Sequence, residues 1–406
     1  MNARFLDIHV LQMLPPSCVN RGEHDLPKTF QLGNSTRAVV TSQSLKRAIR
    51  TAIEKALGEY AVRTRRIPPR VIDALKDAGW PDDLATFAGS QIARCATPKG
   101  LDSDSGRAHR TQNMIYTAEA HLIDDLVALC ASHRTQLQEA LAATTAPKNG
   151  TEGEAEDEEN TAPKRDVKGK RKAEENTTPR TLPGKEVGRI LARRTACIDL
   201  FGRMLAGHED SRVAGAVQMA WAFTTHTAER QPDFYTAQED WGEPGDRGSA
   251  FLSTAFLTAG VFYRYASVNL TDLIAARGGR QDALDLLGLF INAFLYARPG
   301  GKQNSTAPNT LPDTVTYTVR DSCPVSYADA FDQPVRADRH GGYLAPSRRA
   351  LSAHAATSDR LAGTRDRIGH GHTTAHTSPL EHLGPHHAGF HALTAAAVAD
   401  AASPRA

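Results

Sequence analysis

The sequence predicts an α+β protein, because strand patterns and helix patterns both occur along the chain. Arg4–Leu11 alternates Leu, Ile and Val with Asp7 and His9, which is typical of a half-buried strand with the polar residues outward. Within Thr41–Leu57, apolar residues recur every four positions, which predicts an amphipathic helix. Thr314–Arg320 alternates Val, Thr and Tyr, as strands do.

The rest of the ordered chain shows the same mixture. Pro15–Asn34 is irregular and polar, and Val39–Val40 is a short strand before the first helix. Val213–Thr225 is apolar and small, typical of a buried strand or helix. Strand patterns continue at Ala250–Leu257 and Gly260–Leu270, and helical patterns lie at Pro69–Ala78, Leu84–Cys95, Thr117–Cys130, Thr135–Ala143, Asp272–Ala275 and Gln281–Leu295.

Cations cluster at the start of the first predicted helix. Lys46, Arg47 and Arg50 lie off its apolar face, and Thr41 or Ser42 stands where an N-cap belongs. Free backbone N–H groups, the positive end of the helix dipole and three cations together suit a phosphate oxyanion. An ordinary solvated basic face is the alternative.

Composition limits the fold and the function less closely than these patterns do. The 406 residues could form one large or two smaller domains, and a net charge of +2 does not by itself indicate nucleic acid. Five cysteines without CxxC spacing fit a reducing compartment. No apolar run approaches membrane-spanning length, and the N-terminus lacks the zones of a signal peptide. A soluble, cytoplasmic protein is expected.

A charged block interrupts the middle of the chain. Thr151–Asn160 holds six acids in ten residues, and Lys164–Lys172 holds six bases and one acid. Their low apolar content predicts a disordered insertion over about 146–185. The KGKRK run within it could tether RNA or DNA, with a plain solvated linker as the alternative.

The last segment, Arg336–Ala406, holds nine of the sixteen histidines. The spacing of His370, His372 and His376 could bind a transition metal. However, the segment is rich in Ala, Ser, Gly and Arg and has no fixed structural period, which predicts a disordered or loosely helical tail without a metal.

Motifs for catalysis are lacking in the sequence. It contains no GxSxG, Walker loop or HExxH, and no Cys–His pair at a recognisable spacing. His24–Asp25 and His208–Glu209–Asp210 bring acid–base groups together, but adjacent loop residues diverge in direction. We therefore predict neither an enzyme nor a cofactor.

Blocks of sequence carry a resemblance to a known family. An IHVL strand is followed by PPSCVNR, PKT and SQSLKRAIR, then by DLFGRM, AWAFTTHTAERQPDFYTAQEDW, GSAFLSTAFLTAGVFYRYASVNL, ARPGGKQNSTA and SYADAFDQPV. In order and spacing they resemble the Cas7 subunit of type I-E CRISPR surveillance (Cascade) complexes. The blocks cover Phe5–Ala56 and about Asp199–Val335.

The resemblance implies an RRM-like (ferredoxin-like) palm, a helical fingers insertion and a β-hairpin thumb. By this correspondence the palm comprises 1–60, 201–226 and 250–335, the fingers 61–200 and the thumb 227–249. The tail after Val335 does not resemble the end of the family.

The resemblance also implies a site for guide RNA (crRNA). Extended guide RNA must be held by its phosphates, which leaves the base edges free for pairing. The family counterparts of Arg21, Lys28, Lys46 and Arg50 line the crRNA groove. To these the helix adds contacts from Arg47, Ser42 and Gln43, with capping or core packing as the alternative for Ser42.

The same alignment predicts two positions at which a side chain acts as a wedge beside a base of the guide. Phe234 and Tyr235 match paired aromatics of the family's thumb, which folds over the guide held by a neighbouring copy and flips out bases. Their neighbours are polar, and flat rings can stack on an unstacked base. Met204 matches the other wedge position, with core packing as the alternative.

Three more residues complete the predicted RNA contacts. In the strand VFYRYASV, alternation puts Tyr263 and Tyr265 on one face and Arg264 on the other. Arg264 could contact RNA, with core packing as the alternative. Lys302 and Gln303, in a Pro–Gly–Gly loop, could contact the guide or target backbone.

The predicted function is a crRNA-binding backbone subunit that assembles head-to-tail along the guide and holds it for pairing with target DNA. Its partners would be other copies of itself and Cascade subunits of the Cas5, Cas6, Cse1 and Cse2 types, with no membrane. Two alternatives stay open: a relative that cleaves RNA with a metal, and a self-assembling structural protein that binds no nucleic acid.

Overall fold

The computed structural model describes residues 3–97, 100–101, 109–145, 180–203, 212–238, 240–241 and 249–404. The chain forms two compact units. The larger comprises Met1–Gly58, Asp199–Gly202 and Ala214–Ala406, and the smaller comprises Glu59–Ile198 and Arg203–Val213.

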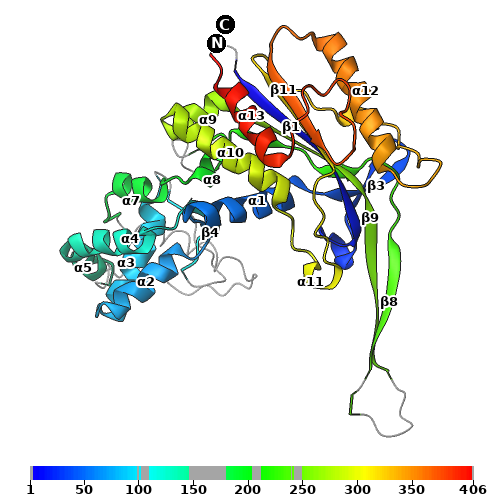
Figure 1. Ribbon diagram of the computed structural model, residues 1–406. Helices are drawn as coiled ribbons and strands as arrows, with labels where there is room; N and C mark the ends of the chain where they lie inside the picture. Colours follow the sequence, from blue (N-terminus) through cyan, green and yellow to red (C-terminus); the bar gives the residue numbers. More distant parts are fainter. Residues whose placement is uncertain are drawn as a thin grey trace, which may run out of the picture. The chain divides into compact units, whose positions relative to one another are not determined.

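A mostly antiparallel sheet organises the larger unit (Figure 1). Its strands follow the order β11-β10-β1-β9-β7-β3-β2, and β6 and β8 also pair with β9. In the described residues these strands are β1 (Phe5–Ser17), β2 (Thr29–Leu32), β3 (Ser35–Val40), β6 (Val217–Met219), β7 (Ala222–Thr224), β8 (Gln231–Gln238), β9 (Ser249–Asn269), β10 (Thr314–Arg320) and β11 (Arg367–Thr374).

Strand β9 is longer than predicted. The two expected strands at Ala250–Leu257 and Gly260–Leu270 are one continuous strand. Its second half lies in the sheet beside β1, whereas residues 249–257 pair with β8. We call β8 and residues 249–257 the ribbon; it projects from the sheet as two paired strands (Figure 1).

Helices cover both faces of the sheet. Leu45 of α1 packs on one face with Val40 and Phe262, and α10 contacts both α1 and α13 on that side. Leu351 of α12 packs on the other face with Tyr263. None of the helices in the described part of the chain is long and apolar enough to cross a membrane. The helical elements of this unit are η1 (Glu23–Asp25), α1 (Ser42–Leu57), α9 (Leu270–Arg277), α10 (Arg280–Tyr296), α11 (Gln303–Thr306), η3 (Ala328–Phe331), α12 (Leu344–Ala362) and α13 (Phe390–Ala402).

Because of this double cover, the prediction of a half-buried first strand is wrong. Asp7 and His9 are fully buried. Tyr265 Oη donates to Asp7 Oδ1 over 2.9 Å, and His9 Nδ1 lies 2.9 Å from Tyr263 Oη. The His9 ring also stacks on Tyr327, with 4.0 Å between centroids. The polar face of β1 is therefore a hydrogen-bonded interior layer.

The prediction of a disordered tail over 336–406 is also wrong for the described residues. The segment forms α12, β11 and α13, and β11 pairs with β10 along its length. Leu351, Leu393 and Ala397 are buried. Nη1 of Arg4 donates to the carbonyl of Ala401 over 3.2 Å, which binds the end of α13 to the start of the chain.

The smaller unit consists of helices and a two-stranded sheet. Its core is formed by side chains such as Val71, Leu75 and Leu126. The predicted helix at Thr117–Cys130 begins later, because Thr117 belongs to a strand. Of the predicted disordered insertion, 146–179 with its KGKRK run lies outside the described residues. The elements are β4 (Ala61–Thr64), α2 (Ile67–Asp77), α3 (Asp82–Cys95), β5 (Ile115–Ala118), α4 (Leu122–Ser132), α5 (Arg134–Thr145), α7 (Gly184–Leu191) and α8 (Ala196–Phe201), whose last residues enter the larger unit.

Buried histidines give the larger unit a predicted pH dependence. Burial lowers the pKa of His9 to about 3, and it also lowers the pKa values of His226, His370 and His372. Below about pH 6.5 the unfolded chain binds protons at these sites, whereas folded His9 stays neutral until about pH 3 and the other three histidines bind protons less readily than in the unfolded chain. We therefore expect stability to be full above about pH 7 and to fall as the pH drops below 6.5, with His9 alone contributing up to about 1.4 kcal/mol per pH unit.

Asp7 acts in the opposite direction over part of this range. Burial raises its pKa to about 6, so between about pH 4 and 6 the folded chain holds a proton that the unfolded chain has released. Urea unfolding at pH 7.5, 6.5, 5.5 and 5 measures the net slope. A free energy of unfolding that stays constant from pH 7 to 5 would contradict the prediction, and His372→Gln should make the slope shallower.

Candidate nucleic-acid interface

The start of α1 is tied to the loop that follows β1. Thr41 stands at the N-cap in an extended conformation, without a side-chain capping bond. Its backbone N–H donates to Asn20 Oδ1 over 2.7 Å, and the Asn20 carbonyl accepts from the Lys28 N–H over 3.0 Å. Asn20 therefore holds the SCVNR loop against the first turn, where Ser42 is half-buried and Gln43 is exposed.

The three cations of α1 have different surroundings. Lys46 is half-buried: Nζ lies 3.5 Å from the carbonyl oxygen of Val217, and burial lowers the pKa of the ammonium group. Arg47 is exposed. Arg50 lies 3.6 Å from Glu54 within the helix. Arg47 is thus the cation of this cluster that points most freely to solvent.

The loop before β2 adds two cations. Arg21 is exposed and forms an ion pair with Asp25 at 3.0 Å. Lys28 Nζ lies 4.9 Å from the centre of the Trp221 ring, an arrangement in which the ring face attracts the cation.

A third segment reaches the same loop from far along the sequence. A Cβ added at Gly301 would lie 2.6 Å from the Cys18 carbonyl oxygen, so only glycine allows this close approach. Burial raises the pKa of the Cys18 thiol, and the nearby charges of Lys302 and Arg21 act against that rise. Lys302 and the exposed Gln303 are therefore placed beside the SCVNR loop.

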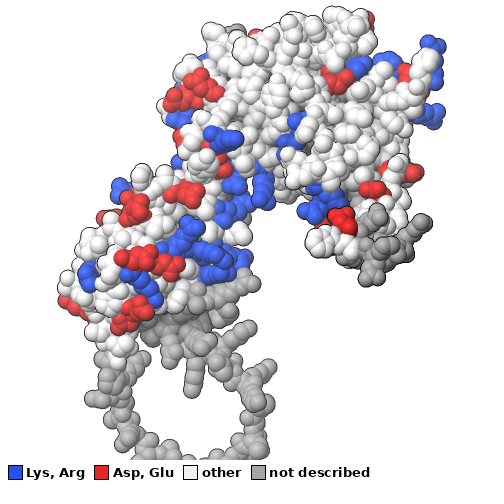
Figure 2. Space-filling view, turned by 60° about the horizontal axis from the view of Figure 1, so that its bottom comes forward, with Lys and Arg blue, Asp and Glu red and all other residues white. Residues whose placement is uncertain are grey.

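The structure thus gathers most of the predicted cations in the larger unit. Contacts through Asn20, Cys18 and Gly301 join the SCVNR loop, the start of α1 and the Lys302 loop. Lys and Arg side chains form separate groups on the face seen in Figure 2, between broad stretches of uncharged residues. Such a local concentration of positive charge attracts phosphate although the net charge is small.

The ribbon presents apolar side chains on both of its faces. Phe234 is 66% exposed, and Tyr235 next to it is also exposed. The register pairs Tyr235 with Ser253 and Thr236 with Leu252, so Leu252 shares a face with Phe234, and Phe251 shares the other face with Tyr235. The Tyr235 and Phe251 rings lie 6.2 Å apart. Each face thus carries a pair of exposed apolar side chains.

Arg264 is a correction to the predicted set of RNA contacts. It does lie on the opposite face from Tyr263 and Tyr265, as predicted, but this face is covered by α10 and Arg264 is only 4% exposed. Its guanidinium donates to Gln12 Oε1 over 2.6 Å and to the Phe294 carbonyl. Met204 lies outside the described residues.

Sequence reasoning missed several residues of this region. Asn20 joins two predicted segments, but nothing in VNR distinguishes a tethering amide from a loop asparagine. Phe251 and Leu252 become partners of Phe234 only through the hairpin register. Trp221, in AWAF, looks like a core aromatic in the sequence yet is 38% exposed.

The histidines named as possible metal ligands lie in or next to a strand of the folded tail. No group of three or more His, Cys, Asp or Glu side chains in the described residues is placed to hold a metal ion. His370 and His372 lie on β11, where His372 is fixed by bonds to the Gly384 carbonyl and the Leu380 N–H. Their side chains serve packing and hydrogen bonding within the fold.

Comparisons with known proteins define the class. Two solved structures resemble the chain over nearly its whole length, one named "CRISPR RNA-guided surveillance complex, pre-nicking" and one "CRISPR RNA-guided surveillance complex". The first shares 34% identity at a TM-score of 0.83, covering 98% of this chain and 100% of the other. The second shares 30% identity at a TM-score of 0.74, covering 97% and 99%. No curated protein gives a significant match.

Fold and comparisons together identify a protein of the Cas7 type. The chain belongs to the family of CT1975-like proteins, whose model matches residues 6–393. The match includes most of the segment after Val335, where no resemblance was predicted.

Proposed function

We propose that this protein is a crRNA-binding backbone subunit of a type I-E CRISPR surveillance complex. The observation that carries the proposal is the convergence of cations from three separate segments at the start of α1. It is supported by the two similar structures, both of which are named as CRISPR RNA-guided surveillance complexes.

In this proposal the start of α1 holds guide phosphates. Arg21, Lys28, Arg47 and Lys302 neutralise phosphate charge, while backbone N–H groups of the first turn and Gln43 donate to oxygens. Lys46 and Arg50 complete the groove from positions where part of each side chain already has a protein contact. Contacts of this kind grip any sequence and leave base edges free to pair with target DNA.

The sheet would be the palm, the smaller unit would contain the fingers and the ribbon would be the thumb. A ribbon with apolar side chains on both faces suits insertion between stacked bases, because every base has an apolar face. A copy that covers the guide of its neighbour forms a head-to-tail contact, which does not close on itself. Other subunits, of the Cas5, Cas6, Cse1 and Cse2 types, would end such a filament. In this proposal the protein binds RNA and does not catalyse a reaction. It acts in the cytoplasm.

The first test is loss of guide RNA in a charge variant. We expect complexes carrying Arg21→Ala, Lys28→Ala and Arg47→Ala to retain less short RNA of defined length, as measured by the absorbance ratio at 260 and 280 nm. The slope of log affinity against log salt should become shallower by about 0.7 for each lost phosphate contact with single-stranded RNA.

Lys55→Ala is the control, because Lys55 is an exposed cation in the last turn of the same helix. It should leave RNA content and salt slope unchanged. Equal RNA content in the triple variant and the unaltered protein would place the guide elsewhere. Assembly in nuclease-treated samples free of RNA would favour a structural protein, and metal-dependent RNA cleavage would favour an RNA-cleaving relative.

A further inference from the structure

The ribbon leaves the sheet near a glycine of β9. This strand pairs with β7 as far as Phe262 and with β8 from Leu257 onward, so residues 258–260 lie between the two pairings. The register of β9 against β1 also shifts at these residues. A glycine inside a strand and a shift of register both allow a strand to bend. Gly260 is therefore the place where the angle between the ribbon and the sheet could change.

The ring of His226 lies against this glycine. A Cβ added at Gly260 would lie 2.7 Å from His226 Nε2, so the ring takes the space that a side chain would fill. The backbone N–H of Val261 donates to Nε2 over 3.1 Å, and Nδ1 lies 2.8 Å from the carbonyl oxygen of Thr227. Because a carbonyl can only accept, Nδ1 carries the proton and Nε2 is the acceptor. The imidazole thus bonds β9 just beyond the point where its pairing with β7 ends.

Contacts with α12 and the residue before it fix the same place. The His226 ring stacks on Tyr343, which precedes this helix, with 3.6 Å between ring centroids and 12° between the planes. Thr225 donates its N–H to the Val261 carbonyl over 2.8 Å, and its hydroxyl oxygen lies 2.8 Å from that of Ser347 in α12. Only 4% of His226 is exposed. A buried ring with a bond at each nitrogen and one stacked face is held in a single orientation.

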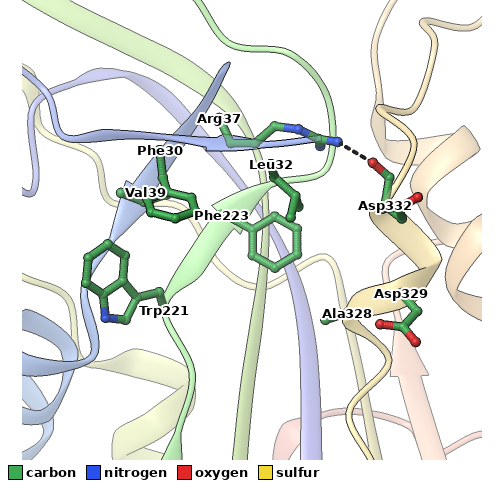
Figure 3. Close-up of a pocket in the computed structure, with 9 residues that line it drawn as sticks. All are labelled: Phe30, Leu32, Arg37, Val39, Trp221, Phe223, Ala328, Asp329 and Asp332. Atoms are coloured by element: carbon green, nitrogen blue, oxygen red, sulfur yellow. Dashed lines mark hydrogen bonds between the residues drawn. The ribbon is translucent and has the colours of Figure 1, made fainter. Parts of the chain in front are cut away.

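Burial and the charge of Arg37 keep this ring neutral. Burial lowers the pKa of His226 and Arg37 lowers it further, although the bond to the Thr227 carbonyl acts in the opposite direction. Arg37 is itself held by three backbone carbonyls, those of Thr224, Phe331 and Asp332. Figure 3 shows the bond to Asp332. Since the ring is neutral at pH 7, its Nε2 remains an acceptor for the Val261 N–H.

The other strand of the ribbon has attachments of its own. The N–H of Ala228, just before β8, donates to the Thr36 carbonyl of β3 over 2.9 Å. Arg230 donates to the Pro27 carbonyl over 3.0 Å. These bonds hold the chain that enters β8, whereas the ring of His226 holds β9.

We propose that His226 sets the direction in which the ribbon leaves the sheet. The inference rests on the proposed function, in which the ribbon covers the guide held by a neighbouring copy, and extends it to the residue that aims the ribbon. His226 is a positioning residue: it contacts the backbone of β9 and not the RNA. Without its ring, β9 can bend at Gly260, and the ribbon no longer reaches the same place on each neighbouring copy.

The first test is hydrogen exchange of backbone amides in the free, whole chain. His226→Leu removes the acceptor, so exchange in peptides of the ribbon and of residues 258–261 should become about tenfold faster, as expected for one lost hydrogen bond. His226→Gln supplies an amide oxygen that can accept from the Val261 N–H and should restore most of the protection. Leu393→Ala is the control, because it changes a buried residue of α13 and should leave exchange in the ribbon unchanged.

The second test counts the copies on each guide in the assembled complex by native mass spectrometry. The complex with His226→Leu should carry fewer copies on a guide of the same length, and the complex with His226→Gln should carry the full number. A looser ribbon with the full number of copies would overturn the inference, because the direction of the ribbon would then not matter for assembly.

Three further outcomes separate the inference from the proposed function. Unchanged ribbon exchange in His226→Leu, with a guide that still depends on Arg21, Lys28 and Arg47, overturns the inference alone. Equally faster exchange in every peptide of the larger unit also overturns it, because His226 would then serve only the core. A complex that carries no guide overturns the proposed function, while exchange in the free chain still decides whether His226 holds the ribbon.

Discussion

A chain that ends at Val335 will not reach a stable folded state, although composition alone predicts a disordered end. The deletion removes α12 from one face of the sheet and α13 from the other. It also turns β10, buried along its whole length, into an edge strand. Apolar surface and unpaired backbone groups would be exposed together, which favours aggregation. Domains are stable by only about 5–15 kcal/mol, so such a loss is not tolerated.

Point variants make the same prediction measurable in soluble protein. Leu351 in α12 and Leu393 in α13 are fully buried, so each change to Ala should lower the free energy of unfolding by about 2–5 kcal/mol. Leu361→Ala is the control, because this residue of α12 is 75% exposed and its replacement should cost less than about 0.5 kcal/mol. Urea unfolding followed by circular dichroism measures all three. Equal stability of the three variants, or cooperative unfolding of the shortened chain, would refute the integrated tail.

The composition of the tail led to the wrong prediction because many small residues can indicate either a disordered segment or a segment that packs closely against its neighbours. A Cβ at Gly369 would overlap the Asp400 carboxylate at 1.9 Å, and one at Gly371 would lie 2.5 Å from His387 Nε2. The glycines of GHGH therefore let α13 and the nearby loop approach β11 directly. An inward face made of glycine shows no apolar alternation, so the strand cannot be recognised from periodicity.

The prediction of β9 left a gap between Leu257 and Gly260 and so divided one strand into two. In the structure the strand continues through this gap, and a Cβ at Gly260 would lie 2.7 Å from His226 Nε2. By contrast, β10 and α1 have a clear polar and apolar period, and both predictions are confirmed, with β10 at the predicted bounds.

In the candidate interface, too, the sequence predicted only the proximity of residues that are close along the chain. The cations of α1 are neighbours along one helix, so their clustering follows from spacing alone. That Lys302 lies beside the SCVNR loop depends on Gly301 packing on the end of β1, a contact between residues almost 300 positions apart. Likewise, local alternation gave the correct face for Arg264, but whether that face meets solvent or α10 is decided by the whole fold.

Replacing Arg264 will therefore destabilise the larger unit rather than weaken RNA binding directly. Arg264→Ala leaves Gln12 Oε1 and the Phe294 carbonyl without their donor and opens a cavity beside the Phe294 ring, which lies 4.6 Å from the guanidinium. The expected loss is about 3–5 kcal/mol. Arg264→Met keeps most of the volume and should lose less, about 1–3 kcal/mol, because it also removes a buried charge. Burial and the repulsion of Arg298 lower the pKa of that charge to about 10.

Measuring stability and salt dependence in the same variants separates the two roles. Arg264→Met should lower the urea midpoint and leave the slope of log affinity against log salt unchanged in assembled complexes. Arg47→Ala should do the reverse, because Arg47 is exposed and a lost phosphate contact makes the slope shallower by about 0.7. If Arg264→Met instead made the slope shallower at unchanged stability, the buried geometry would not describe the working complex. The guanidinium would then have to reach the RNA.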